Sequence, residues 1–315
     1  MKIGRVLVVP AFAAALAAGL AACSASAGPD TADIITPSSA GAAAQAAGGS
    51  LELASAQPPA DGVAAEPPPG GADPATTDAT PQADVAQPST SHVALKHLIG
   101  DVDPATDPKF ARIPDKYIGG SRVWGHKDAV EAFVRMAEDA AANGYKLKIV
   151  SAFRSFSDQK QIWEDKWNGK TLVGGKKLNT SLPDPKARAL KILEFSSMPG
   201  TSRHHWGTDF DLNALDNKYF TNTKEGRRIY DWLVGHAANY GFCQVYTAKG
   251  EGGRPTGYEE EKWHWSYRPV AAWYLKQYPI DVGYERLTGF AGSEAAKDID
   301  VIPNYVQGIN PECMQ

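Results

Sequence analysis

Two histidines and two aspartates lie within eight residues, in the segment PGTSRHHWGTDFDLN. Zinc sites in hydrolases take three ligands from histidine, aspartate and glutamate side chains and leave a fourth position for water. His204 and Asp211 could supply two such ligands, with His205 and Asp209 as competing candidates. If residues 208–213 form a strand, Asp209 and Asp211 face the same side of it, so strand alternation does not choose between them.

The segment EEEKWHWSY contributes a third histidine, His264. In a strand, alternation places the aromatic residues on one inward face and His264 with Ser266 on the other, facing a cleft. The aromatic residues are Trp263, Trp265 and Tyr267. Glu261 precedes His264 by three residues, so the chain must bend if both side chains point at one metal ion. A carboxylate beside a metal-activated water is the usual general base in peptide hydrolysis.

A third segment, SAFRSFSDQ, holds Arg154 where a strand is expected to end, just before a helix. The guanidinium group keeps its positive charge and could face the same cleft as the histidines and carboxylates. There it could stabilise a developing oxyanion or hold a substrate carboxylate.

The elements that must position these residues are helices and short strands in mixed order. Apolar spacing predicts a helix over 128–143, stopped by Gly144, whose inward residues are Val130, Phe133, Val134, Ala137 and Ala141. A strand should follow and end at Arg154, and Ser157 should cap the next helix. Further predictions are helices over 184–195 and 224–240 and strands over 208–213, 242–247 and 263–267. This order favours an α+β fold, a single domain in which helices flank a small antiparallel sheet.

The first 22 residues have the pattern of an export signal, because Lys2 and Arg5 precede seventeen uncharged residues. The run ends in LAAC at Cys23, which resembles the lipobox of bacterial lipoproteins and implies lipid on that sulfur. An uncleaved signal anchor is the alternative, since seventeen residues is at the lower limit for a bilayer span. Either form tethers the protein outside the cytoplasm. Ser24 after the cysteine suggests the outer membrane, facing the periplasm, in a Gram-negative cell.

Residues 23–92 are predicted to be a disordered linker and residues 93–315 the folded domain. The linker is rich in alanine, proline and glycine, and the chain has no lysine or arginine between Arg5 and Lys96. Such a composition offers too little apolar surface to offset the entropy of ordering the chain.

The net charge is −4, with −8 on residues 24–95 and +2 on residues 96–315. A nearly neutral folded part argues against a nucleic-acid partner, because nucleic-acid binders neutralise many phosphates with clustered basic residues. Cys243 and Cys313 lie in the folded part, and an oxidising exported compartment favours a disulfide between them over two separate thiols.

Taken in order, SAFRSFSDQ, PGTSRHHWGTDFDL and GYEEEKWHWSY resemble the zinc D-alanyl-D-alanine carboxypeptidases, VanY-like peptidases of the wider lysostaphin and hedgehog group. The family motif S-x-H-x-x-G-x-A-x-D lies over Ser202, His204, Gly207 and Asp211. The motif E-x-W-H lies over Glu261, Trp263 and His264. The resemblance implies Zn²⁺ on His204, Asp211 and His264, with Glu261 as the catalytic base.

Other residues match the family in part. Arg154 matches the arginine of the tyrosine-arginine-serine segment, although phenylalanine replaces the tyrosine. Gln159 matches a downstream glutamine as a structural or substrate-facing residue, and Ser202 is implied to bind substrate. Asp209 stands where alanine is common, which makes it a supporting group or an alternative ligand. Arg203 stands where glutamate is common.

The activity that the resemblance implies is a zinc-dependent D,D-carboxypeptidase that removes the terminal D-alanine of peptidoglycan stem peptides. A zinc-bound water would attack while Glu261 takes its proton, and Arg154 would share the charge of the tetrahedral intermediate. The alternatives are an L,D-carboxypeptidase, a D,D-dipeptidase, a stem-peptide endopeptidase and a non-catalytic zinc-containing wall-binding domain. We expect a monomer held at the membrane by the lipid on Cys23.

Overall fold

The computed structural model describes residues 92–250 and 253–315. The predicted signal peptide, the lipid on Cys23 and the linker up to residue 91 therefore lie outside the described residues. Within the two described ranges, no helix combines the length and the apolar character that crossing a bilayer requires.

Helices and short strands alternate along the described chain. The α-helices are α1 (Leu95–Leu98), α2 (Lys127–Ala142), α3 (Phe156–Trp167), α4 (Leu178–Ser181), α5 (Pro185–Ile192), α6 (Asn217–Asn222), α7 (Lys224–His236), α8 (Arg268–Asp281) and α9 (Ala295–Asp298). The strands are β1 (Phe110–Arg112), β2 (Trp124–His126), β3 (Ile149–Ser151), β4 (Asp209–Leu212), β5 (Phe242–Gln244) and β6 (His264–Tyr267). This composition confirms the α+β prediction.

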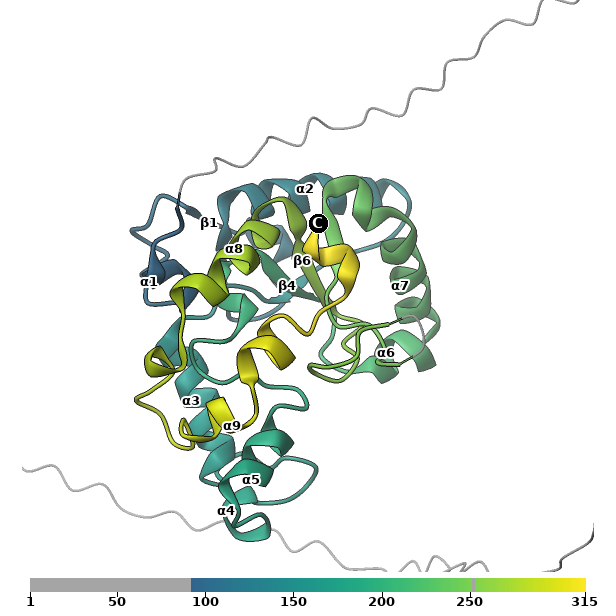
Figure 1. Cartoon of the computed structure of the whole chain (residues 1–315). Coiled ribbons are helices and arrows are strands. Elements are labelled where there is room, and N and C mark those ends of the chain that lie inside the picture. The colour runs from purple at the N-terminus through teal and green to yellow at the C-terminus, as the bar shows by residue number, and fades with distance from the viewer. Residues whose placement is uncertain (1–91, 251–252) are drawn as a thin grey trace, which may run out of the picture. The chain divides into compact units, whose positions relative to one another are not determined.

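The strands form two small antiparallel sheets. The larger has the strand order β3-β4-β6-β5 and lies at the centre of the domain, with α2, α7 and α8 around it (Figure 1). The smaller sheet pairs β1 with β2 and was not predicted. Each of its strands is only three residues long, which is too short to show a clear alternation.

The pairing of β4 with β6 sets which residues face the same side. Asp209 lies opposite Ser266, and Asp211 lies opposite His264. Because side chains alternate along a strand, these four polar residues share one face of the sheet. Phe210, between the two aspartates, points to the other face.

Helix α2 covers that apolar face. The ring of Phe133 on α2 lies 5.8 Å from the ring of Phe210, measured between centroids, in an edge-to-face arrangement. The prediction that Ala141 faces inward is wrong, because Ala141 is exposed and Ala140 is fully buried. Ala140 follows Phe133 by seven residues, which is two helical turns and therefore the same face.

Helix α3 begins two residues earlier than predicted. Ser155, not Ser157, is the N-cap: its side chain accepts a hydrogen bond from the Asp158 backbone N–H, and the Asp158 carboxylate accepts one from the Ser155 N–H. This reciprocal capping box satisfies two backbone N–H donors at the start of the helix, and it forms at Ser155 with Asp158.

Other predicted boundaries extend too far. Strand β3 ends at Ser151 rather than Arg154. Its pairing with β4 joins Ile149 to Leu212 and Ser151 to Asp211, and no residue of β4 pairs beyond Ser151. The helix that begins at Pro185 ends at Ile192, and α7 ends at His236 before a 3-10 turn over Ala237–Tyr240.

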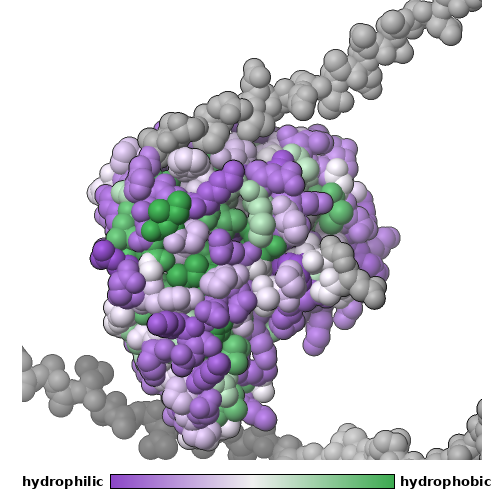
Figure 2. All heavy atoms as spheres, in the orientation of Figure 1, coloured by the Kyte–Doolittle hydropathy of each residue, from purple (hydrophilic) through white to green (hydrophobic). Residues whose placement is uncertain are grey.

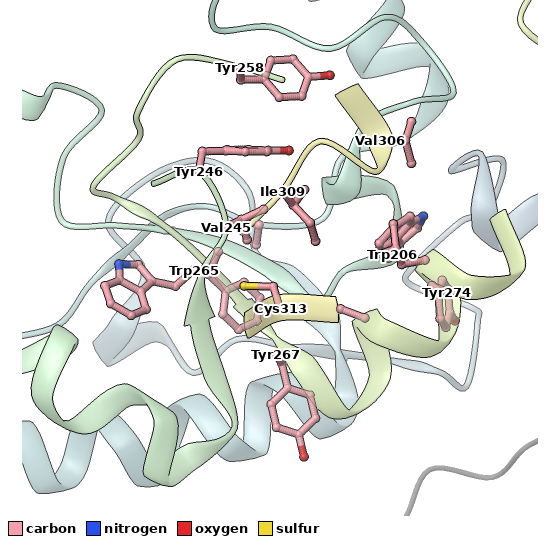
Figure 3. Close-up of a cluster of buried hydrophobic side chains, with 14 of the residues drawn as sticks. Trp206, Val245, Tyr246, Tyr258, Trp265, Tyr267, Tyr274, Val306, Ile309 and Cys313 are labelled. Carbon is pink, nitrogen blue, oxygen red and sulfur yellow. The ribbon is translucent and has the colours of Figure 1, made fainter. Parts of the chain in front are cut away.

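A hydrophobic cluster on the side of β5 and β6 joins the sheet to the C-terminal segment (Figure 3). The cluster includes Trp265 and Tyr267 of β6 together with Val306 and Ile309 of the C-terminal segment. Trp263 was predicted to share this face, but it precedes β6 and lines the polar cleft described below. Hydrophilic residues cover most of the face drawn in Figure 2, and hydrophobic residues show between them, most densely in the upper left part.

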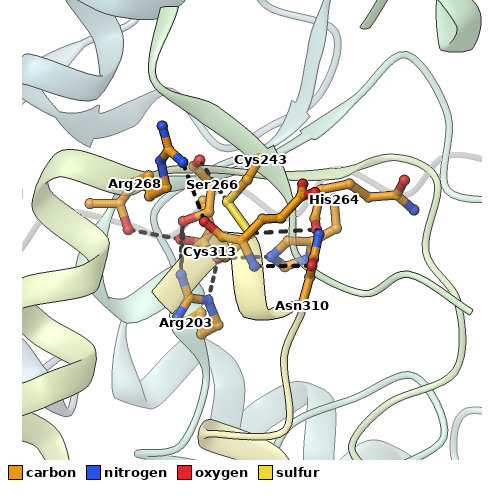
Figure 4. The surroundings of a disulfide bond; sticks show 11 residues. Arg203, Cys243, His264, Ser266, Arg268, Asn310 and Cys313 are labelled. Atoms are coloured by element: carbon orange, nitrogen blue, oxygen red, sulfur yellow. Dashed lines mark hydrogen bonds and ion pairs between the residues drawn. A yellow bond between two sulfur atoms is a disulfide. The ribbon is translucent and has the colours of Figure 1, made fainter. Parts of the chain in front are cut away.

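The predicted disulfide is confirmed: Cys243 on β5 is bonded to Cys313, with a Cα–Cα distance of 5.7 Å (Figure 4). Asn310 reinforces the link, because its backbone N–H donates to the Val245 carbonyl and its side-chain amide donates to the Gln244 carbonyl. The C-terminal segment is thus fixed to the edge strand of the sheet.

Candidate active site

A cleft of about 600 Å³ opens on the polar face of the sheet. One wall comes from α3 and from the segment 195–197 after α5, and the other comes from residues 215–218 at the start of α6. The cleft is also lined by the predicted site residues Arg154, Ser202, His204, Asp211, Glu261 and His264. The fold therefore brings together side chains from segments more than 100 residues apart.

His204 lies on a tight turn that returns the chain to β4. The turn ends at Gly207, whose φ is +70°, and a Cβ there would lie 2.7 Å from the His126 backbone nitrogen. Only glycine fits such a position. His204 Nδ1 lies 3.0 Å from the Ala152 carbonyl oxygen and donates its proton to it. The lone pair of His204 Nε2 therefore faces the cleft, 3.3 Å from Asp211 Oδ2.

His264 completes a cluster of three buried groups that could hold a metal ion. Its Nδ1 lies 3.2 Å from Asp211 Oδ1, and one ligand atom from each of His204, Asp211 and His264 falls within 4.8 Å of the others. Ligand atoms about 2.0–2.2 Å from a tetrahedral zinc ion are roughly 3.3–3.6 Å apart. Asp211 Oδ1 is buried and accepts no hydrogen bond in the described part of the chain. The three side chains therefore fit a small cation.

Asp209 lies behind His264 rather than among the three ligands. Its Oδ2 is 3.0 Å from His264 Nε2, on the side of the ring opposite the Nδ1 that faces Asp211. The carboxylate accepts the Nε2 proton, so Nδ1 is the ring nitrogen that faces Asp211 and Glu261. A carboxylate in this position fixes the tautomer and the orientation of a metal-binding histidine. The structure thus answers the question that strand alternation left open.

Asp209 is itself held by a buried polar network. Arg203 Nε donates to Asp209 Oδ2 at 2.8 Å, and the hydroxyls of Ser266 and Thr208 donate to Oδ1 at 2.7 and 2.8 Å. Arg203 Nη2 also donates to Ser266, and these contacts lie next to His264 and the disulfide (Figure 4). Asp209 is fully buried and Arg203 is 1% exposed. Burial alone would raise the pKa of Asp209, but the charge of Arg203 and the hydrogen bonds lower it overall.

The charges around His264 favour a cation at this point. Burial would lower the pKa of His264, but the adjacent carboxylates of Asp209, Asp211 and Glu261 raise it well above its ordinary value. The surrounding carboxylates therefore hold a proton on the ring. His204, Asp211 and His264 would hold a metal ion here, and that ion would supply the same positive charge.

His205, the competing candidate, is turned away from the cluster. Its Nε2 accepts a hydrogen bond from the Gly200 N–H at 3.1 Å, and its Nδ1 donates to the Arg154 carbonyl at 2.6 Å. Both ring nitrogens are engaged, and burial lowers the pKa of His205 to about 3. The ring is neutral and supports the turn that carries Arg154.

A turn between Glu261 and His264 brings the Glu261 carboxylate to the cluster, as their spacing of three residues required. The His264 N–H donates to the Glu261 carbonyl oxygen across this turn, and Glu261 Oε2 lies 3.1 Å from His264 Nδ1. The carboxylate lines the cleft and is 6% exposed as a residue. Burial raises the pKa of Glu261 above its ordinary value, although the hydrogen bond from His264 opposes the shift.

Arg154 lies beside the cluster, with Nη2 4.0 Å from Asp211 Oδ2. Gln159 positions it: the amide oxygen accepts from Arg154 Nη1 at 2.7 Å, and the amide nitrogen donates to the Ser197 carbonyl at 2.7 Å. Gln159 is fully buried and therefore structural. The Ser202 hydroxyl lines the cleft, is buried, and has no hydrogen-bond partner among the described residues.

The cleft also contains residues that the sequence analysis did not single out. Tyr246 lies with its ring 4.7 Å from the His264 ring, and Lys166 and Ser196 line the wall next to Arg154. Lys166 follows Gln159 by seven residues, so helical spacing places both on one face of α3. That spacing was the available signal for Lys166, whereas Tyr246 and Ser196 carry none.

Comparison with known proteins identifies related sequences. Residues 123–270 match the sequence model of the family described as VanY, D-alanyl-D-alanine carboxypeptidase. YodJ of Bacillus subtilis, which is named as a carboxypeptidase, is 30% identical over 146 residues, or 45% of each chain. A D-alanyl-D-alanine carboxypeptidase of Enterococcus faecalis is 28% identical over 133 residues, 42% of this chain and 44% of that one. The chain thus spans about half the length of the curated relatives that it matches.

A solved structure of a mutant of the vancomycin resistance D,D-pentapeptidase VanY in complex with Zn(II) is also similar. It has 22% sequence identity and a TM-score of 0.36, with 58% of this chain and 93% of that chain covered. The region that matches the family's sequence model contains Arg154, His204, Asp211, Glu261 and His264, which is the whole cluster built above. Residues 123–270 of this chain are therefore similar to the VanY family of D-alanyl-D-alanine carboxypeptidases.

Proposed function

We propose that this protein is a zinc-dependent D,D-carboxypeptidase that removes the terminal D-alanine from peptidoglycan stem peptides. The observation that carries the proposal is the buried cluster of His204, Asp211 and His264, with Glu261 beside it, at an open cleft. Two imidazoles and one carboxylate are a typical donor set of catalytic zinc, and one ligand atom from each of the three side chains lies within 4.8 Å of the others.

The side chains around the cluster have the groups that peptide hydrolysis needs. Bound zinc would supply a Lewis acid that lowers the pKa of water and polarises a carbonyl group. Glu261 would accept a proton from water and return it to the leaving amine, and burial raises its pKa above the ordinary value. Arg154 would place a positive charge beside the oxygen of the tetrahedral intermediate. Asp209 and Gln159 would hold His264 and Arg154 in position.

The test uses the full chain, stripped of metal and then assayed with and without zinc on defined tetrapeptide and pentapeptide muropeptides. Mass spectrometry identifies the products. The proposal expects loss of one alanine from the pentapeptide only, and only with zinc. Loss of alanine from the tetrapeptide would instead identify an L,D-carboxypeptidase, loss of a dipeptide a D,D-dipeptidase, and internal cleavage an endopeptidase. Stoichiometric zinc without any product would indicate a binding domain.

We also propose that the chain is an envelope lipoprotein, anchored through lipid on Cys23 and directed to the outer membrane in a Gram-negative cell. The support is the basic, apolar and LAAC sequence at its start. In a bacterial host, mass spectrometry of the mature chain should show a lipid-modified N-terminal cysteine, with Cys23→Ala as the control. Wild-type chain that is released unmodified into the soluble fraction would contradict the anchor.

A further inference from the structure

Lys166 is a half-buried cation in the wall of the cleft. It lies in the last turn of α3, and its ammonium group contacts the hydroxyl of Ser196. Across the described ranges, no carboxylate oxygen lies within 4.0 Å of Lys166 Nζ. The two arginines that line the cleft do have such partners, since Arg154 lies beside Asp211 and Arg203 beside Asp209.

Burying the charged ammonium group of Lys166 without a carboxylate partner costs free energy. Burial lowers the pKa of Lys166 below its ordinary value, and the nearby charge of Arg154 acts in the same direction, while Glu261 opposes them. A bound anion next to the ammonium group would offset that cost, because opposite charges interact strongly where water is excluded.

Hydroxyl groups that line the same cleft complete a set of anion-binding donors. The Ser196 hydroxyl already contacts Lys166, and the side chain of Ser196 is largely buried. The Ser202 hydroxyl is buried, lines the cleft and has no partner in the described part of the chain. A carboxylate has two oxygens that accept several hydrogen bonds, so an ammonium group and two hydroxyls match its needs.

A short chain of contacts joins this group to the candidate reaction centre. Arg154 donates to Gln159, Gln159 donates to the carbonyl of Ser197, and Ser197 follows the Ser196 that contacts Lys166. A substrate held at Lys166 is therefore held next to Arg154. In a carboxypeptidase the terminal carboxylate is only three bonds from the scissile carbonyl carbon, so it must bind close to the reaction centre.

We propose that Lys166, with the hydroxyls of Ser196 and Ser202, forms the subsite for the terminal carboxylate of the peptide substrate. This assignment rests on the proposed function and makes Lys166 the residue that distinguishes a free chain end from an internal peptide bond. A second carboxylate elsewhere in a stem peptide could satisfy the same donors, so the experiment separates the two sources.

The experiment compares zinc-loaded full chain with two variants, Lys166→Met and Lys166→Arg, on a pentapeptide with a free terminal carboxylate and on its terminal amide. The matched control is Lys160→Met, the same substitution on the same helix at a lysine that pairs with Glu164. Thermal unfolding of each variant establishes that it is folded. Lys166→Met should raise KM for the acid by about 10- to 100-fold with little change in kcat, as loss of a charged hydrogen bond predicts.

Three further results support or overturn the assignment. Lys166→Arg should keep KM within a few fold, and the preference of the wild type for the acid over the amide should largely disappear in Lys166→Met. An unchanged KM and an unchanged acid preference in Lys166→Met would show that the subsite is wrong. Equal losses on the acid and the amide would overturn the terminal assignment and indicate a carboxylate elsewhere in the peptide.

A binding measurement separates this proposal from the proposed function. In a Glu261→Gln background, isothermal titration with the same free pentapeptide should show about 10- to 100-fold weaker binding when Lys166→Met is added. If the wild type cleaves nothing, the proposed hydrolysis is refuted, and the titration still reports on the subsite. Equal affinity with and without Lys166 in that background would refute the subsite alone.

Discussion

Replacing Asp209 by asparagine removes one charge from a fully buried network and keeps its shape. The carboxylate accepts hydrogen bonds from His264, Arg203, Ser266 and Thr208. The amide has one acceptor oxygen in place of two, so some of these donors lose their partner. Arg203 in particular is left as a buried charge without a counterion.

The magnitude follows from the two roles of Asp209. Removing one partner of a buried ion pair costs about 3–5 kcal/mol, and Arg203 and Asp209 are 1% and 0% exposed. We therefore expect Asp209→Asn to lower the free energy of unfolding by about 3 kcal/mol, because the amide retains part of the hydrogen bonding. Loss of the group that orients a metal-binding histidine typically weakens metal affinity by about 10- to 100-fold.

The assay is a competition between the protein and a chromophoric zinc chelator, with urea unfolding measured on the same samples. Thr208→Val is the matched control, because it removes one hydroxyl donor to the same carboxylate without touching His264. It should cost about 1 kcal/mol of stability and leave zinc affinity unchanged. Zinc affinity within twofold of wild type in Asp209→Asn would refute the argument that Asp209 orients His264.

The remaining predictions concern the base, a ligand, the disulfide and a buried histidine. Glu261→Ala should keep stoichiometric zinc and lose at least about 100-fold in kcat, whereas His264→Ala should lose both zinc and activity; activity in either variant would contradict the assigned roles. Replacing Cys243 and Cys313 by alanine should lower the free energy of unfolding by about 4 kcal/mol, from the loop of 70 residues that the disulfide closes, and reduced wild type should match the variant in urea. Burial lowers the pKa of His126 to about 4, so below pH 6.5 the unfolded chain takes up a proton that the folded chain does not. Stability should therefore fall by about 1.4 kcal/mol per pH unit from 6.5 to 4 from this group, and His126→Phe should have a shallower slope.

The sequence predicted the site better than the boundaries of the elements around it. Strand alternation placed Asp209 and Asp211 on one face, and pairing with β6 confirms this. Alternation could not separate the two aspartates, because that depends on how the His264 ring is rotated between them. Ser155 and Ser157 are both acceptable caps by composition, and the reciprocal bond with Asp158 decides between them.

Residues of the cleft wall were the least predictable. Lys166 lies at helical spacing from Gln159, but the importance of that face depends on where α3 packs. Ser196 and Tyr246 reach the cleft only because the segment after α5 and the end of β5 fold toward it. Lys166 contacts Ser196 across 30 positions of the chain, and the Tyr246 ring packs on His264 from another segment, so no local pattern in the chain encodes these contacts.

The two faces of β6 connect the stability of the domain to the geometry of the site. His264 and Ser266 point into the polar network around Asp209, while Trp265 packs on the opposite side in the cluster that the C-terminal segment completes. The disulfide residue Cys243 pairs with Ser266 across the β5–β6 ladder, so the bond that fixes the tail also fixes the strand next to the metal ligand. Because ligand positions matter to a fraction of an ångström, a rigid neighbouring strand is a requirement of the site as well as of the fold.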